Sequence, residues 1–270
     1  MERSFSKQVF EVNSDLRLPF EPKGEALAFK EEIRRNVKLL NPSEYNHLNA
    51  RLITSEKGFF DVENVLFYNV GSGAFSHLRL DELTYSLVYG SSSQRGKYTY
   101  SYELTPEATT GEINDTMLEF SFDMDKIASD MKPLDYWLAF YKGDIKISKL
   151  LNPKVFGLSF IIALPVKHRN IISLVKPMID GVIASFHYQN SVDQEVLDYI
   201  ATKKHISEDA VLSQLRRKDY ALLGERNFIS SYRDGIIWNP ADEKCTKVNI
   251  KQVTGINKGV KIYGKVYLLK

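Results

Sequence analysis

Residues 83–89 (LTYSLVY) alternate large apolar side chains with smaller ones, and residues 98–102 (YTYSY) repeat this pattern. Between them lies the turn-forming stretch 90–96 (GSSSQRG). A period of two puts every second side chain on the same face of a strand. The pattern therefore predicts an antiparallel hairpin with an aromatic ladder on one face.

The tyrosine ladder of this hairpin has two interpretations. Exposed aromatic side chains that alternate along a strand can stack on nucleic-acid bases. Buried ones are ordinary sheet core. Leu83 and Leu87 share the face of the tyrosines, which favours the core.

Working outward from the hairpin, the sequence predicts an α+β fold with a β-rich N-terminal half. Strands are expected at 4–12, 49–54, 62–70 and 117–122, and a helix at 24–40. A helical segment at about 170–217 follows, in which Ser207 resembles an N-cap, and the C-terminus is again β-rich. Regions 1–145 and 146–270 are separate units or one continuous domain, and no internal repeat is evident.

Composition and apolar runs indicate the cellular compartment in which the protein is expected. A single cysteine, Cys245, allows no intramolecular disulfide, which is typical of a reducing compartment. The N-terminal residues contain no apolar segment typical of a signal peptide. The longest apolar run, 160–166, is too short to span a bilayer. We expect a soluble cytoplasmic protein without a membrane partner.

Charge is distributed unevenly along the chain. Residues 1–150 carry 18 basic and 23 acidic side chains, whereas residues 151–270 carry 18 and 11. The densest basic cluster is Lys203 and Lys204 with Arg216, Arg217 and Lys218. These residues are candidates for binding the phosphates of DNA or RNA. The alternative is that they solvate the ends of a helix, where basic side chains also suit the helix dipole.

Two further sequence patterns bear on possible chemistry. The run 69–75 (NVGSGAF) follows an apolar stretch and contains Gly-x-Gly, as nucleotide-binding loops do. It lacks the third glycine and the room for a crossover helix, so a plain glycine turn is favoured. The five histidines show no zinc-binding spacing, and Cys245 is not accompanied by a histidine that would activate it.

Asp61 and Glu63 form the clearest candidate for metal binding. Two carboxylates at i and i+2 lie on the same face of a strand, and hard oxygen ligands suit a divalent cation. The alternative is an exposed, solvated start of a strand.

The run 170–180 adds Lys176 and Asp180 at a spacing of four. This spacing resembles part of the motif of RusA-type Holliday-junction resolvases, Asp-x-Asp-Asn-Leu-x-Lys followed by an Asp on the same helix. The two leading aspartates are replaced by Asn170 and Ile172. The run 61–64 (DVEN) resembles the missing part, but it lies more than a hundred residues upstream. The resemblance implies magnesium-dependent cleavage of phosphodiesters, although Asp180 is also placed to pair with Lys176.

The leading hypothesis from sequence is therefore a non-enzymatic binding or assembly protein without a cofactor. Its expected partners are DNA or RNA, bound through the basic C-terminal half, or other protein subunits. The alternative is a divergent metal-dependent endonuclease in which Mg²⁺ is held by Asp61, Glu63 and Asp180. It requires these carboxylates within roughly 5 Å of a common point. Nothing in the sequence requires them to meet, and we expect them to lie apart.

Overall fold

A computed structural model describes residues 3–42, 45–58, 60–90, 96–106 and 115–269. The strands are β1 (Arg3–Phe5), β2 (Val9–Ser14), β3 (His47–Thr54), β4 (Glu82–Tyr89), β5 (Tyr98–Thr105), β6 (Thr116–Met124), β7 (Asp144–Ile147), β8 (Phe156–Leu164), β9 (His187–Tyr188), β10 (Gly224–Glu225), β11 (Ile229–Tyr232), β12 (Gly235–Trp238), β13 (Cys245–Thr254) and β14 (Val260–Leu268). The α-helices are α1 (Glu25–Val37), α2 (Pro133–Tyr141), α3 (Ile172–Ala184), α4 (Gln194–Lys204) and α5 (Glu208–Leu215). Short helical turns are η1 (Asn64–Tyr68), η2 (Ser72–Phe75) and η3 (Asp242–Lys244).

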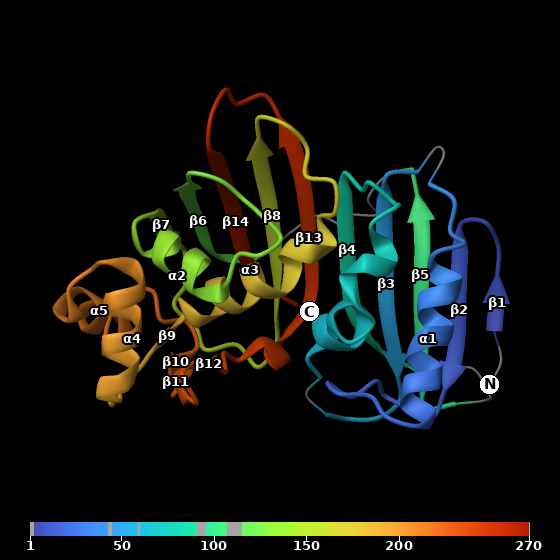
Figure 1. Cartoon of the computed structure of the whole chain (residues 1–270), viewed down its shortest axis with the longest axis horizontal. Helices are drawn as coiled ribbons and strands as arrows, with labels where there is room; N and C mark the ends of the chain where they lie inside the picture. Colours follow the sequence, from blue (N-terminus) through green and yellow to red (C-terminus); the bar gives the residue numbers. More distant parts are fainter. Residues whose placement is uncertain (1–2, 43–44, 59, 91–95, 107–114, 270) are drawn as a thin grey trace.

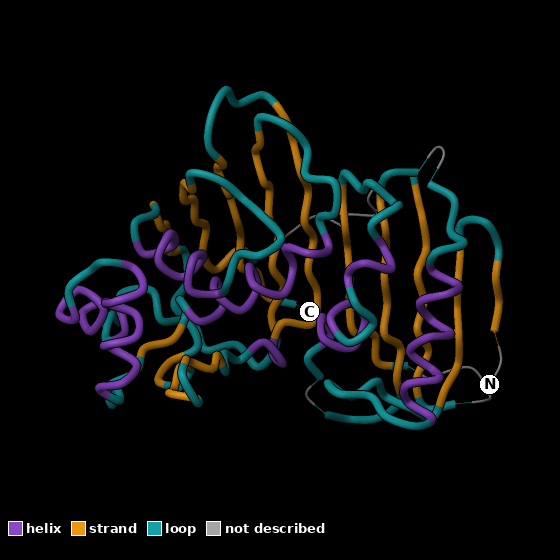
Figure 2. The backbone as a smooth tube through the Cα atoms, viewed as in Figure 1, coloured by secondary structure: helices purple, strands orange, loops and turns teal. Residues whose placement is uncertain are grey.

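Ten of these strands form one mixed sheet in the order β1-β2-β5-β3-β4-β13-β8-β14-β6-β7. The helices α1, α2 and α3 and the turns η1 and η2 lie over the same face of it (Figures 1 and 2). Alternation along the strands directs the apolar side chains to this helical face, where they form the main core. The predicted α+β class is confirmed.

The segments of the predicted hairpin are strands β4 and β5, and their alternating residues share the core face. Leu83, Tyr85, Tyr100 and Tyr102 are buried, so the ladder belongs to the core, while Tyr89 at the strand end is exposed. The predicted direct pairing is wrong, because β3 lies between the two strands, parallel to β4 and antiparallel to β5. β4 ends at Tyr89 and β5 begins at Tyr98, and these two strands lie two strand spacings apart, a distance that a tight hairpin turn could not span.

The predicted strand over residues 62–70 is also wrong. Residues 64–68 of this run form η1, which lies within the connection between the parallel strands β3 and β4. Parallel neighbours need a crossover that leaves the sheet and returns over one face. The run Val65, Leu66 and Phe67 is buried because this crossover packs on the core side of the sheet. An apolar run of this length does not distinguish a buried strand from a buried helical turn.

The sheet contains the same topology twice, a repeat that the sequence does not reveal. In the first half the sheet order is β2-β5-β3-β4, and in the second half it is β6-β14-β8-β13. In each half the first pairing and the second are antiparallel and the third is parallel. A helix follows the first strand of each half (α1 or α2), and a helical crossover joins the parallel strands (η1 with η2, or a connection that includes α3).

The two halves meet where β4 pairs with β13 in antiparallel fashion, from Lys247 opposite Ser86 to Lys251 opposite Glu82. We call this boundary the seam. Because the equivalent strands β4 and β13 meet antiparallel, an approximate twofold relates the two halves. It brings η1 of the first half and α3 of the second beside the seam, where they contact each other (Figure 1). Segments more than a hundred residues apart in sequence are thereby brought together.

A smaller core lies at the far end of the second half. Trp137 of α2, Val196 of α4, Val211 of α5 and Phe228 before β11 are buried in it. The predicted helical segment corresponds to α3, α4 and α5, and the Ser207 side chain accepts a hydrogen bond from the Ala210 N–H as expected of an N-cap. The division into regions 1–145 and 146–270 remains an interpretation, since one sheet runs through both.

Candidate functional site

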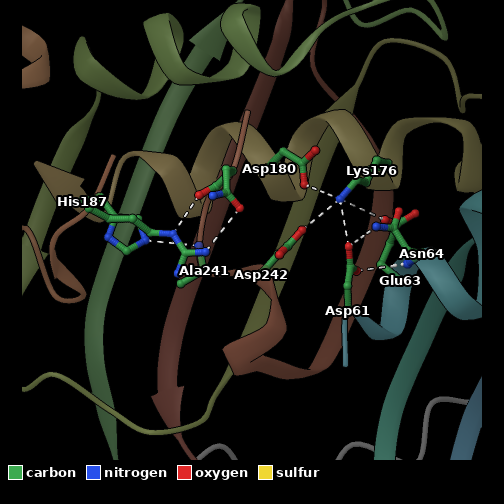
Figure 3. A network of polar contacts seen from close by, with 10 residues as sticks. Asp61, Glu63, Asn64, Lys176, Asp180, His187, Ala241 and Asp242 are labelled. Atoms are coloured by element: carbon green, nitrogen blue, oxygen red, sulfur yellow. Dashed lines mark hydrogen bonds and ion pairs between the residues drawn. The ribbon is translucent and has the colours of Figure 1, made fainter. Parts of the chain in front are cut away.

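The three carboxylates singled out from the sequence converge beside the seam. Their common point is the Lys176 Nζ, which lies 2.8 Å from Asp180 Oδ1, 3.1 Å from Asp61 Oδ2 and 3.8 Å from Glu63 Oε2. A fourth, Asp242 Oδ2, lies 2.9 Å away. Figure 3 shows all four directed toward the lysine. The expectation that these residues lie apart is wrong. We call the five residues the carboxylate–lysine cluster.

Asp61 and Glu63 do not share the face of a strand, as the sequence analysis expected. They flank the start of a helical turn, where Asp61 Oδ1 accepts a hydrogen bond from the Asn64 N–H at 3.1 Å. The Asn64 side-chain amide donates to the other Asp61 oxygen. An aspartate at this position satisfies N–H groups that have no partner within the helix. The run 61–64 is therefore rigidly placed at the edge of the crossover.

Lys176 and Asp180 lie one turn apart on α3 and form the ion pair that their spacing predicts. The helix forms because its apolar stripe, including Val175, Ile179 and Val182, packs onto the sheet. Gly181 lets α2 approach closely, because a Cβ there would overlap the Pro133 carbonyl oxygen. This close packing fixes the part of α3 that carries Asp180.

Asp242 was missed by the sequence analysis. It lies in η3, just before β13, in a loop that the buried His187 anchors (Figure 3). The His187 Nε2 accepts a hydrogen bond from the Ala241 N–H at 3.2 Å, and its Nδ1 donates to the Gly224 carbonyl at 3.2 Å. Burial lowers the pKa of His187 to about 4, so the neutral ring holds this geometry. The sequence signal that could have identified Asp242 is the acidic pair at 242–243, which follows the Asn-Pro turn at 239–240.

Burial controls the protonation of the cluster. It raises the pKa of Asp61 to about 6 and that of Asp180 to about 7, partly offset by the Lys176 charge. Burial also raises the pKa of Glu63 well above its usual value. The surrounding carboxylates more than offset the burial of Lys176, so the pKa of its ammonium is raised. Four acids around a single ammonium leave an excess of negative charge that favours bound protons or another cation.

On the inner side of the cluster, two carboxylate oxygens lack a hydrogen bond. Glu63 Oε2 is buried without a hydrogen bond, and its ion pair with Lys176 at 3.8 Å is long. Asp180 Oδ1 contacts the ammonium but lacks hydrogen-bond geometry. Asp61, Lys176 and Asp242 keep 21%, 20% and 16% of their side chains exposed, so the cluster reaches the surface. In the part of the chain that the structure describes, no group of three or more acidic, histidine or cysteine side chains is arranged to hold a metal ion.

The predicted phosphate-binding cluster is largely engaged within the molecule. Lys204 pairs with Asp135, and the Lys203 Nζ lies 3.0 Å from the Tyr199 hydroxyl. Arg217 pairs with Asp219 at 3.1 Å. These residues and Lys218 lie on or after α4 and α5, at the end of the molecule away from the seam (Figure 1). The structure does not bring them to the carboxylate–lysine cluster.

The glycine run is a turn between η1 and η2. Gly71 has a positive φ of 94°, which suits glycine, and the Arg34 Nη1 donates to the neighbouring Val70 carbonyl at 2.7 Å. A Cβ at Gly71 would lie 2.6 Å from that guanidinium, so the space beside the turn is filled by Arg34. This arrangement is that of a packed turn.

Comparisons with known proteins identify no family. No model of a protein family matches the sequence, and no curated protein is significantly similar to it. A solved structure described as "Cyanuric acid hydrolase: evolutionary innovation by structural concatenation" shares 10% identity with a TM-score of 0.18. That similarity covers 96% of this chain and 66% of the other, and its TM-score supports no conclusion on fold or function. Among the described residues, no helix has the length and apolar character needed to cross a membrane.

Proposed function

We propose that the protein is a divalent-cation-dependent hydrolase that cleaves phosphodiester bonds in nucleic acid. The observation that carries the proposal is the convergence of Asp61, Glu63, Asp180 and Asp242 on one point, within 3.8 Å of the Lys176 Nζ. Carboxylate oxygens are the ligands that Mg²⁺ and Mn²⁺ prefer. The Lys176 ammonium acts as a stand-in cation at this point.

Access for a metal depends on Lys176. Its side chain is long and 20% exposed, and the ammonium would have to turn toward solvent to admit a cation. The acidic side chains would then surround a position with excess negative charge, and the unsatisfied Glu63 Oε2 would gain a partner. A bound cation would supply charge stabilisation for a phosphate and lower the pKa of water. A displaced Lys176 would be available to contact a phosphate oxygen.

Holding a cation would require the carboxylates of Asp61 and Asp180 in their ionised form, so cation binding would release the protons that their raised pKa values favour. The bound cation would supply a water of lowered pKa for attack on phosphorus. The proton of that water would go to solvent, the bond to the leaving ester oxygen would break, and that oxygen would take a proton from solvent.

The assay is cleavage of single-stranded, duplex and branched DNA and of single-stranded RNA, with Mg²⁺, Mn²⁺ or EDTA. We expect metal-dependent cleavage that Asp61→Asn and Glu63→Gln each reduce at least about 100-fold. Asp81→Asn is the matched control, because Asp81 pairs with Lys167 at the surface and should leave cleavage unchanged. Thermal unfolding verifies that each variant is folded.

A second readout does not depend on choosing the right substrate. Millimolar Mg²⁺ or Mn²⁺ should raise the melting temperature of the wild type, and Asp61→Asn should weaken this effect. Cleavage that persists in Asp61→Asn would contradict the proposal. So would the absence of any metal effect on stability together with the absence of cleavage.

A further inference from the structure

The face of the sheet opposite the helices carries a second feature, at strands β13, β8 and β14. In register, Lys251 of β13 lies beside Ile161 of β8, which lies beside Tyr263 of β14. Cross-strand partners share a face. The adjacent row, with the buried Ile250 and Phe160, faces the core, so the Lys251 row faces away from it.

Two apolar side chains in this row are exposed. Ile161 is 43% exposed and Tyr263 is 44% exposed, side by side on neighbouring strands. The Lys261 Nζ lies 5.5 Å from the centre of the Tyr263 ring, which places a cation next to an accessible aromatic face. Isolated exposed apolar residues are common, but an exposed tyrosine among cations is a combination that nucleic-acid surfaces use.

All the charged side chains of these three strands are basic. The strands contain Lys247, Lys251, Lys261 and Lys265, and neither an aspartate nor a glutamate. The flanking strands β4 and β6 supply acidic neighbours: Glu82 lies 3.9 Å from Lys251, Glu119 lies 2.8 Å from Lys265, and Asp123 lies opposite Lys261 in the strand register. Lys251 and Lys265 are about half exposed in their ion pairs, which therefore hold them weakly. We call Ile161, Tyr263 and the four lysines the open-face patch.

We propose that the open-face patch binds single-stranded nucleic acid. A base stacks on Tyr263 next to Ile161, and the lysines contact the phosphates on either side. From Lys247 to Lys251 is about 13 Å along the strand, and β13 and β14 are about 10 Å apart, which suits two or three nucleotides. This inference is independent of the proposed hydrolase, whose carboxylate–lysine cluster lies on the helical face.

Charge favours this partner over a second copy of the chain. In a second copy, the acidic side chains next to the patch already lie beside that copy's own lysines, whereas a phosphate backbone brings a negative charge with every nucleotide and releases counterions. Base stacking on a tyrosine needs an accessible ring but no sequence-specific contact. We therefore expect binding to tolerate different sequences and both kinds of sugar.

The test uses fluorescence anisotropy with labelled oligo-dT and oligo-U of about 12 nucleotides, in EDTA so that no cleavage interferes. Tyr263→Ala should weaken binding about tenfold, whereas Tyr263→Phe, which keeps the ring, should bind like the wild type. Tyr232→Ala is the matched control. Tyr232 is 52% exposed and lies 5.1 Å from the Arg233 guanidinium, outside the patch, so its loss should have no effect.

The second part of the test measures how the affinity for the oligonucleotides depends on salt concentration. Replacing Lys251 and Lys265 together with alanine should reduce the slope of log affinity against log salt by about 1.4. Because EDTA removes the divalent cations that the proposed hydrolase requires, this binding is measured apart from that activity. Equal affinity of wild type and Tyr263→Ala, an unchanged salt slope, or no binding of either oligonucleotide would overturn the inference. Self-association that Tyr263→Ala abolishes, without oligonucleotide binding, would identify a second copy as the occupant instead.

Discussion

Replacing Lys176 with methionine tests the electrostatic role of the cluster directly. The substitution keeps an unbranched side chain but removes the ammonium that lies within 3.8 Å of Asp61, Glu63, Asp180 and Asp242. Removing one partner of a buried ion pair costs about 3–5 kcal/mol. At about pH 8 we expect this loss of unfolding free energy, seen as a melting temperature lowered by roughly 6–20 °C.

The cost should depend on pH in a defined direction. As the pH falls to about 4, the acids take up protons and no longer need the ammonium, so the difference between the variant and the wild type should shrink. Lys149→Met is the matched control. Its ion pair with Asp115 at 3.2 Å is exposed, so its loss should cost less than about 1 kcal/mol at either pH.

A divalent cation should partly rescue the Lys176→Met variant. If Mg²⁺ or Ca²⁺ takes the place of the ammonium, a concentration of about 100 times its dissociation constant restores about 2.7 kcal/mol. The measurement is thermal unfolding over pH, with and without the cation. A variant as stable as the wild type at about pH 8 would refute the reasoning, because the carboxylates would then not need Lys176.

Three further outcomes are expected. The wild type should lose unfolding free energy as the pH rises from about 4 through about 7. The reason is that the raised pKa values of Asp61 and Asp180 make the folded state bind protons more tightly than the unfolded chain does. Asp180→Asn should flatten this pH profile in denaturant titrations. Alanine at all three basic positions 216–218 should flatten the salt dependence of nucleic-acid binding if that segment contacts phosphate, and gel shifts over a salt series that match the wild type would exclude it. Gly264→Ala should destabilise the fold by about 1–3 kcal/mol, because its Cβ would overlap the Phe120 ring, whereas Gly73→Ala, with open space around it, is the control in the same thermal assay.

The sequence by itself determined which residues face the core. Alternation placed Leu83, Tyr85, Tyr100 and Tyr102 on one face, and they are buried there. Helical periodicity located α3, and the spacing of Lys176 and Asp180 predicted their ion pair. These features depend on backbone geometry within a single segment, which is why they are readable without the rest of the chain.

The neighbours of each strand were decided only by the tertiary structure. Alternation states which face a side chain takes, but the same pattern fits a hairpin and a pair of strands with β3 between them. Burial alone likewise did not separate a strand from the helical turn η1 at residues 64–68. The position of β3 between β4 and β5 and the helical turn η1 in the crossover both follow from the parallel pairing of β3 with β4, a contact between distant segments.

The candidate site is a product of that pairing. Asp61 and Glu63 come from the crossover of one half, and Lys176 and Asp180 come from the crossover of the other. They meet because β4 and β13 join the two halves at the seam. Asp242 enters the cluster because His187 holds the backbone of Ala241. No local pattern encodes these distances, since each depends on how whole strands and helices pack against one another.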